Sequence, residues 1–189
     1  MNINKQRSPL QATDTEPGFA IWLTGLPASG KTTLGLALRP RLPAYGRPVQ
    51  LLDSDELRRT LTPDPSYSPA ERDWFYDVIV FLAELLTRNG VNVLIAATGT
   101  RRAYRDAARE RLARFAEVFV DTPPDVCRER DPKGLWARAD AGEISGLPGV
   151  DAPYERPARP EVRVDTGRLS LAEAAQQVMA ELEQQGFFW

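Results

Sequence analysis

The stretch "GLPASGKTT", residues 25–33, decides the fold of this chain. It follows the short apolar run "FAIWLT" (19–24), which predicts a buried strand, and it leads into a helical pattern over residues 32–42. Its letters match the P-loop pattern G-x-x-x-x-G-K-T in full, in the strand-to-helix context that this pattern requires. We therefore predict a binding site for the phosphates of a nucleoside triphosphate. The alternative interpretation is a glycine-rich turn with no ligand.

The residue types in this loop suit phosphate chemistry. Glycines let the backbone wrap so that its N–H groups face phosphate oxygens, Lys31 reaches the β- and γ-phosphates, and the Thr32 hydroxyl can ligate Mg²⁺. ATP and Mg²⁺ are the expected cofactors, and phosphoryl transfer or hydrolysis is the expected reaction class. The predicted phosphate-binding residues are Gly25, Ala28, Ser29, Gly30, Lys31, Thr32 and Thr33.

Composition narrows the function classes. The 189 residues fit one domain, and 24 Lys and Arg against 26 Asp and Glu give a net charge of −2, so no global charge favours nucleic acid or an anionic membrane. The single cysteine, Cys127, fits a reducing compartment, and no apolar stretch approaches the roughly 20 residues of a membrane span, so we predict a cytoplasmic protein. The chain has no histidine, so proton abstraction falls to a carboxylate, a lysine or the substrate.

Alternating patterns continue along the chain. Further strands are predicted at residues 49–53, 91–97, 116–121 and 161–166, with helices between them. One helix begins at the capping sequence "SPAE" (68–71), and the C-terminal helix begins with a second capping box. Strands that alternate with helices predict a three-layer α/β/α fold around a central five-stranded parallel sheet.

The ends of the chain and one internal segment differ from this pattern. Residues 1–18 are predicted to form a flexible arm before a kinase domain at 19–189. Residues 131–160 are rich in Gly, Pro and charge, and are predicted to form a long loop that acts as a lid. The terminal Phe187, Phe188 and Trp189 need a partner surface, either in a dimer or on the same chain.

Two carboxylates follow the second predicted strand in "LLDSDELR". Asp53 and Asp55 stand where open parallel sheets bind their ligands. Beside a P-loop, one can hold the Mg²⁺ shell while the other accepts the proton of an acceptor hydroxyl. We predict both as catalytic and Asp55 as the metal carboxylate with Thr32. The alternative is that Asp55 caps the following helix.

The residues also resemble a known family. "GLPASGKTT", "LLDSDELRRTL", "YSPAERD" and "VFVDTPPDVCRERDPKGLWARADAGEISGLPGVDAPYERPARPEVRVDT" are similar to adenylylsulfate kinase, over about residues 19–182. The resemblance implies ATP-dependent phosphorylation of the 3′-hydroxyl of adenosine 5′-phosphosulfate. It further implies that Arg58, Arg72 and Lys133 hold the phosphosulfate end of this acceptor, that Asp55 is the base and that Tyr67 packs on the adenine.

Departures from the family pattern fall on the acceptor side. Ser54 and Glu56 occupy the positions of a family Gly and Asn, and Asp77 stands where an Arg is common. Gly99 and Thr100 occupy a Ser-Pro step. Two predicted acceptor contacts are also changed: Phe75 replaces an Asn, and Leu147 replaces an aromatic residue of the lid.

These departures leave two alternatives to the implied activity. One is a kinase of the same fold that acts on a different small alcohol, and the other is a non-catalytic nucleotide-dependent switch or assembly subunit. The expected partners are the small-molecule acceptor and a second copy of the chain in a homodimer, with functional coupling to an ATP sulfurylase.

Overall fold

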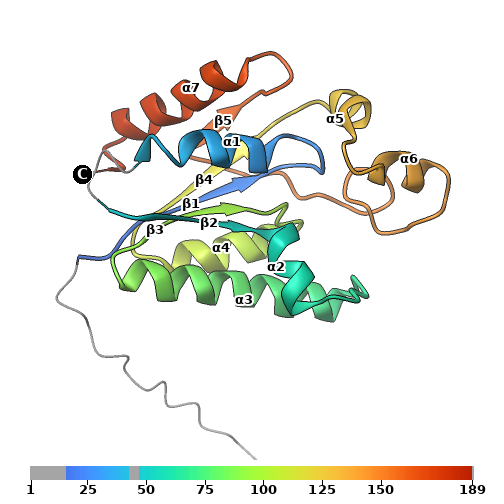
Figure 1. Cartoon of the computed structure of the whole chain (residues 1–189), viewed down its shortest axis with the longest axis horizontal. Helices are drawn as coiled ribbons and strands as arrows, with labels where there is room; N and C mark the ends of the chain where they lie inside the picture. Colours follow the sequence, from blue (N-terminus) through green and yellow to red (C-terminus); the bar gives the residue numbers. More distant parts are fainter. Residues whose placement is uncertain (1–15, 43–46, 189) are drawn as a thin grey trace, which may run out of the picture.

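The computed structural model describes residues 16–42 and 47–188. Its centre is a five-stranded sheet in the order β2-β3-β1-β4-β5, in which every neighbouring pair is parallel (Figure 1). The strands are β1 (Ala20–Thr24), β2 (Val49–Asp53), β3 (Asn92–Ala96), β4 (Phe115–Val120) and β5 (Val162–Val164). Each predicted strand is present to within three residues at either end.

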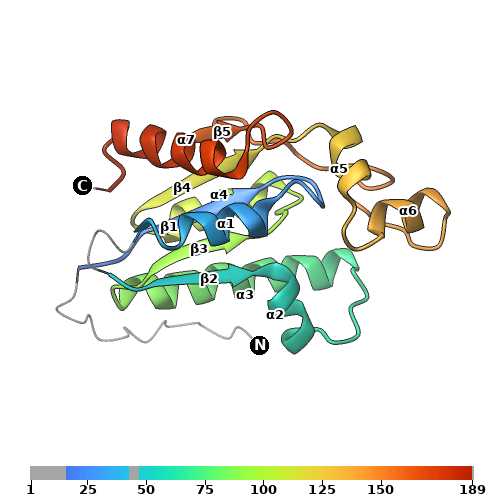
Figure 2. The ribbon, with the colours of Figure 1, turned by 45° about the horizontal axis from the view of Figure 1, so that its top comes forward.

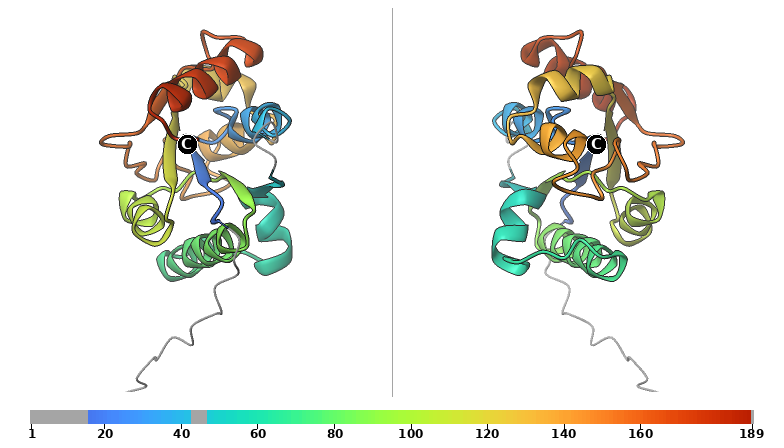
Figure 3. Two further views of the ribbon diagram at one scale, coloured as in Figure 1. Left: turned by 90° about the vertical axis from the view of Figure 1, so that its left-hand side faces the viewer. Right: turned by 90° about the vertical axis from the view of Figure 1, so that its right-hand side faces the viewer.

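Helices connect the strands and cover both faces of the sheet. They are α1 (Lys31–Leu38), α2 (Ser54–Leu61), α3 (Pro69–Arg88), α4 (Arg102–Arg111), α5 (Pro124–Arg130), α6 (Leu135–Asp140) and α7 (Leu171–Gln184). The pair α1 and α7 lies on one face and the pair α3 and α4 on the other (Figure 3). The predicted three-layer α/β/α fold with a parallel five-stranded sheet is confirmed.

The alternation of side chains along β1 divides the core. Ile21 and Leu23 point to the face covered by α1 and α7, whereas Ala20 and Trp22 point to the face covered by α3 and α4. All four side chains are fully buried. A strand buried on both faces reads as a continuous apolar run, which explains the pattern at residues 19–24.

Local capping signals fix the long helix α3. The Ser68 side chain accepts a hydrogen bond from the Glu71 backbone N–H at 3.3 Å, and Pro69 takes the first helical position. The helix ends before Asn89. At α7 the capping box is reciprocal between Ser170 and Glu173. Both predicted helix starts are confirmed.

One predicted helix end and one predicted loop were wrong. Helix α1 ends at Leu38 instead of residue 42, because Pro40 has no N–H with which to continue it. The segment 131–160 is not entirely loop, since it contains α6. Trp136 of α6 is fully buried beside Cys127 and Leu147 in a small separate core. Figure 2 shows α5 and α6 at the same end of the molecule as α2 and the loop before α1.

The predictions for the chain ends are tested only where the structure describes them. Residues 1–15 and Trp189 lie outside the described residues. Phe187 and Phe188 pack edge-to-face on Phe19, with ring centroids 5.3 and 5.4 Å away. The alternative of a partner surface on the same chain is therefore confirmed for these two rings.

Candidate active site

A cavity of about 840 Å³ opens at the carboxyl edge of the sheet. Its walls come from the loop before α1, the start of α2, the segment joining α5 to α6 and the turn after β5. It lies where parallel sheets bind their ligands. The charged and hydroxyl-bearing side chains that line it include Lys31, Thr32, Asp53, Asp55, Arg130 and Lys133.

Backbone geometry explains the residues of the loop. A Cβ at Gly25 would lie 2.5 Å from the Val120 carbonyl oxygen, so strand β4 leaves no room for a side chain there. Gly30, the N-cap of α1, has φ of 95°, a value that favours glycine. Ala28 has φ of 63°, a conformation that costs a non-glycine residue energy and is typical of functional loops.

Not all of the predicted phosphate-binding residues line the cavity. Ala28 and residues 30–33 do, but Gly25 and Ser29 do not. Ser29 is fully buried, and its carbonyl oxygen accepts hydrogen bonds from the hydroxyls of Thr122 and Thr166 at 3.0 and 2.7 Å. The Ser29 backbone thus fixes the loop to these two threonines and does not line the cavity.

Lys31 reaches back over the loop. Its Nζ donates hydrogen bonds to the carbonyl oxygens of Gly25 and Leu26 at 3.0 and 2.7 Å. Loss of hydration lowers the pKa of Lys31 to about 8, although the charge of Asp55 opposes the shift. The ammonium is thus held in place by carbonyls that a phosphate can replace.

The two carboxylate oxygens of Asp53 have different hydrogen-bond partners. The Thr32 hydroxyl donates a hydrogen bond to Asp53 Oδ2 at 2.6 Å. Asp53 Oδ1 accepts from the backbone N–H groups of Asp55 and Glu56 at 2.8 and 3.3 Å, which makes Asp53 the N-cap of α2. The alternative that Asp55 caps this helix was wrong, because the cap position is two residues earlier.

Asp55 faces the cavity with about half of its side chain exposed, and its partner comes from the lid. Lys133 Nζ forms a close ion pair with Asp55 Oδ2. Since Asp53, and not Asp55, contacts Thr32, the two carboxylates occupy different positions: Asp53 at the loop and Asp55 beneath the lid.

Four of the predicted acceptor residues, none of which lines this cavity, form one cluster around α2 and the start of α3. The guanidinium carbon of Arg58 lies 3.8 Å from the ring centroid of Phe75 and 4.9 Å from that of Tyr67. The guanidinium carbon of Arg72 lies 5.3 Å from the Tyr67 centroid. Glu71 forms an ion pair with Arg58 at 2.9 Å. The structure therefore brings both predicted anion-binding arginines to the Tyr67 ring, and Arg58 to the Phe75 ring as well.

The lid contacts this cluster. Arg72 Nη2 donates a hydrogen bond to the Gly146 carbonyl oxygen at 3.0 Å, and its Nε donates to the Tyr67 carbonyl oxygen at 2.9 Å. Leu147 is placed differently from the expectation, because only 7% of it is exposed and it packs beside Trp136. Its role as an acceptor contact stays a prediction.

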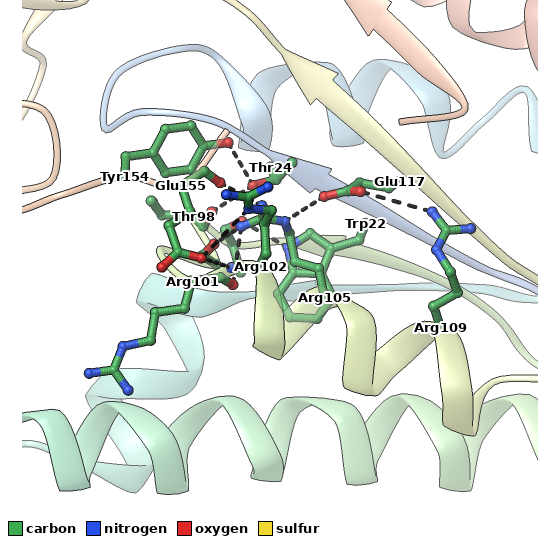
Figure 4. A network of polar contacts seen from close by, with 12 residues as sticks. Trp22, Thr24, Thr98, Arg101, Arg102, Arg105, Arg109, Glu117, Tyr154 and Glu155 are labelled. Carbon is green, nitrogen blue, oxygen red and sulfur yellow. Dashed lines mark hydrogen bonds and ion pairs between the residues drawn. The ribbon is translucent and has the colours of Figure 1, made fainter. Parts of the chain in front are cut away.

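A buried polar network fixes the return of the lid to the sheet (Figure 4). Arg105 of α4 is 1% exposed; its Nε forms an ion pair with the buried Glu117, and it donates to the carbonyl oxygens of Gly99 and Glu155. The Tyr154 hydroxyl lies 3.0 Å from the Thr24 hydroxyl at the end of β1. One arginine thus joins the loop after β3 to the end of the lid.

Sequence reasoning missed part of the cavity wall. Arg130 and Thr166 both line it, and Arg130 Nη1 donates to Thr166 Oγ1 at 3.0 Å. Arg59, one position after the predicted Arg58, also lines it. The available signal was the position of Thr166, two residues after β5, at the sheet edge where the other strands carry site residues.

The oxygen groups around the loop fit a magnesium ion. A hydroxyl and a carboxylate, from Thr32 and Asp53, are the hard ligands that Mg²⁺ takes together with phosphate oxygens and water. Within residues 16–42 and 47–188, no three His, Cys, Asp or Glu side chains group as a metal cluster. The chain therefore offers Mg²⁺ a hydroxyl and a carboxylate, and the other ligands would be phosphate oxygens and water.

The fold and this site define a class of protein. A P-loop at the carboxyl edge of a parallel sheet, with Lys31 on the loop, a hydroxyl bound to a carboxylate and a lid contacting the same edge, is the arrangement of a P-loop kinase. In the described part of the chain, no helix is long and apolar enough to cross a membrane.

Comparison with known proteins identifies the family. Residues 17–165 match the profile of adenylylsulphate kinase. The chain is 42% identical over 170 residues to the probable adenylyl-sulfate kinase of Pyrococcus abyssi, covering 90% of this chain and 98% of that protein. It is 44% identical over 170 residues to the adenylyl-sulfate kinase of Synechococcus sp. strain JA-3-3Ab, covering 90% and 97%. The chain belongs to the adenylylsulphate kinase family.

A solved structure agrees with this assignment. The structure of the Mycobacterium tuberculosis APS kinase in complex with AMPPNP and APS matches with a TM-score of 0.82 at 38% identity, covering 88% of this chain and 98% of that one. The resemblance inferred from the motifs is therefore confirmed.

Proposed function

We propose that this protein transfers the γ-phosphate of ATP to the 3′-hydroxyl of adenosine 5′-phosphosulfate, giving 3′-phosphoadenosine 5′-phosphosulfate. The observation that carries the proposal is the position of Asp55. It lies on the cavity that Lys31 and Thr32 also line, and one helical turn before Arg58 in the arginine cluster. A base between a triphosphate site and an anion site is what a kinase with an anionic alcohol acceptor needs.

The triphosphate side works by charge and position. Lys31 exchanges its two carbonyl partners for phosphate oxygens and offsets charge on the transferring group. Thr32 and Asp53 would hold Mg²⁺, which would supply positive charge to neutralise the phosphates. Asp53 thereby takes the role that the sequence assigned to Asp55.

The acceptor side supplies the proton acceptor and the cations. Asp55 accepts the proton of the attacking hydroxyl, and the acceptor's anionic groups draw Lys133 away from its present ion pair with this carboxylate. Arg58 and Arg72 bind the phosphosulfate, because guanidinium groups present paired N–H donors and stay charged. Tyr67, which is 46% exposed, packs on the adenine.

One alternative remains for the acceptor. Glu56, Gly99, Thr100 and Leu147 depart from the family pattern, and a kinase of this fold for another small alcohol would keep the triphosphate site unchanged. The non-catalytic switch is disfavoured because Lys31, the hydrogen-bonded pair Thr32 and Asp53, and Asp55 all line one cavity.

A coupled assay of ADP release tests the assignment. At saturating Mg-ATP, adenosine 5′-phosphosulfate should give rapid turnover, and a panel of sugar and hydroxy-acid alcohols should give none; Lys31→Ala serves as the blank. Product formation from another alcohol alone would overturn the acceptor and leave the kinase. No turnover with any alcohol, together with a thermal shift by ATP analogues, would favour the switch.

We further propose the cellular setting that the sequence predicted: a cytoplasmic homodimer in sulfate assimilation, coupled to an ATP sulfurylase that supplies the acceptor. The exposed Trp74 and Phe81 of α3, at 48% and 50%, support a contact between copies on this helix. Light scattering of the purified chain, with Phe81→Arg as the variant expected to dissociate it, tests the dimer.

A further inference from the structure

Phe75 has a position that the family resemblance did not lead us to expect. It was predicted as an acceptor contact, yet only 1% of it is exposed. Its edge packs into the core under α3, with the Tyr76 ring 5.8 Å away, while its face lies 3.8 Å from the Arg58 guanidinium carbon. The ring contacts the arginine that we assign to the acceptor anion, and it is covered from the cavity.

The guanidinium of Arg58 is held on several sides. Phe75 lies under it, and Glu71 Oε1 accepts from Nη1 at 2.9 Å. Glu71 is itself fixed, because its Oε2 accepts from the backbone N–H and the hydroxyl of Ser66, both at 2.6 Å. These hydrogen bonds from Ser66, with the charge of Arg58, lower the pKa of Glu71. The result is an arginine whose side chain is only 12% exposed and held in one orientation.

This arrangement leaves donors for a ligand. Among the residues that the structure describes, the hydrogen bonds of Arg58 run through Nη1, to Thr62 and Glu71. A phenyl ring contacts the guanidinium through its face and takes up no N–H, so Nε and Nη2 remain available to an anion. An asparagine at this position, as in the family pattern, would instead offer its own hydrogen bonds.

We propose that Phe75 is a positioning residue that fixes Arg58 for the acceptor anion. This inference rests on the proposed function. A free arginine side chain loses rotamer entropy when a ligand fixes it, so an arginine that is held before binding gives a lower acceptor KM. The resemblance implies that the family's Asn contacts the acceptor directly. Phe75 instead acts indirectly, by holding Arg58 in place for the acceptor.

Steady-state kinetics of Phe75→Leu test the proposal. Leucine keeps the apolar volume and removes the π face, so we expect the acceptor KM to rise about five- to tenfold, as fits a partly desolvated cation–π contact, with kcat and the ATP KM within about twofold. Phe75→Tyr keeps the face and should restore the KM. Phe187→Leu, the same change at a ring that packs on Phe19 and lies outside both the cavity lining and the Arg58 cluster, should leave all constants unchanged. If Phe75→Leu fails to fold, Phe75→Met takes its place.

A double-mutant cycle with Arg58 separates positioning from packing. In an Arg58→Ala background, Phe75→Leu should change the kcat/KM for the acceptor by less than about twofold, because its effect acts through the arginine. An equal loss in both backgrounds, or a loss that Phe75→Tyr does not restore, would overturn the proposal. Absence of turnover with adenosine 5′-phosphosulfate in the unmutated protein would instead overturn the proposed function.

Discussion

The hydroxyl of Thr32 and the carboxylate of Asp53 are 2.6 Å apart, and this contact joins the start of α1 to the end of β2. The same carboxylate caps α2 through its other oxygen. One residue therefore connects the triphosphate side of the site to the helix that carries Asp55 and Arg58.

Two substitutions of Asp53 separate these roles. Asp53→Asn keeps a good N-cap but removes the charge, so kcat should fall on the order of a hundredfold with little change in melting temperature. Asp53→Ala removes both, and loss of a cap worth about 1 kcal/mol should also lower the melting temperature by roughly 2–4 °C. Calorimetry and the Mg²⁺ dependence of the rate are the measurements. Full activity of Asp53→Asn would show that another group holds the metal.

We assign Lys31 as the cation for the transferring phosphate. Lys31→Ala should lower kcat by about a thousandfold or more, because no histidine is present and Lys31 is the lysine of the loop itself. Single-turnover assays with saturating ATP provide the measurement. Turnover within tenfold of the unmutated enzyme would show that the triphosphate is misplaced.

The lowered pKa of Lys31 predicts proton uptake on nucleotide binding. Above the pKa of about 8 the free protein holds a neutral amine, and phosphate charge reprotonates it. The Kd of an ATP analogue should therefore rise by up to about tenfold per pH unit above this value and be flat below it. Between about pH 8 and pH 10.5, the lowered and the ordinary pKa of this lysine, the unfolded state binds more protons at this site than the folded state. The free energy of unfolding should therefore increase with pH over this range.

Titration calorimetry in two buffers of different ionisation enthalpy measures this uptake directly. At pH 9 the uptake should approach one proton per nucleotide, and at pH 7 this lysine should contribute none. Lys31→Arg stays charged throughout and is the control. Equal uptake by both proteins at pH 9 would assign the proton to another group.

Arg105 gives a prediction for stability. Arg105→Met leaves the buried Glu117 with the longer ion pair to Arg109, at 3.9 Å, and without its close partner, which should lower the free energy of unfolding by about 3–5 kcal/mol. The matched control is Arg128→Met, because Arg128 pairs with Asp140 at the surface and the loss of an exposed ion pair should destabilise the protein far less. Denaturant unfolding compares the two, and similar losses would contradict the buried role of Arg105.

The sequence predicted those parts of the fold that local signals specify. The strand predicted at 19–24 lies at Ala20–Thr24 because a parallel strand buried on both faces is a nearly continuous apolar run, and α3 begins after its N-cap Ser68 because capping is a contact within four residues. Helix α6 has no such signal. Its six residues are held by tertiary contacts, including the Trp136 indole N–H that donates to the Pro27 carbonyl oxygen at 3.2 Å.

The site was predicted by residue type more than by role. Motif spacing located Lys31, Thr32, Asp53 and Asp55, but which carboxylate contacts the hydroxyl depends on where β2 ends against α1. The burial of Phe75 likewise follows from how α3 packs on the sheet. Local spacing marks position 75 only as apolar and does not predict its neighbours.

Arg72 gives the last prediction, because it contacts both the acceptor cluster and the lid. Through Nη2 it holds the Gly146 carbonyl oxygen, and through Nε it holds that of Tyr67. Charge-assisted hydrogen bonds are worth roughly 1.5–3 kcal/mol, so Arg72→Ala should raise the acceptor KM by about ten- to a hundredfold while the ATP KM stays within about twofold. Initial rates at saturating Mg-ATP measure this.

The control for Arg72 is a second arginine associated with the lid. Arg138 pairs with Glu143 at 3.4 Å, about half of its side chain is exposed, and Arg138→Ala should leave both KM values unchanged. Arg72→Lys keeps the charge but loses the paired N–H donors, so it should recover only part of the acceptor affinity. An equal rise in the KM of ATP and of the acceptor would mean that Arg72 acts by placing the lid over the whole cavity, and its assignment to the acceptor anion would then be withdrawn.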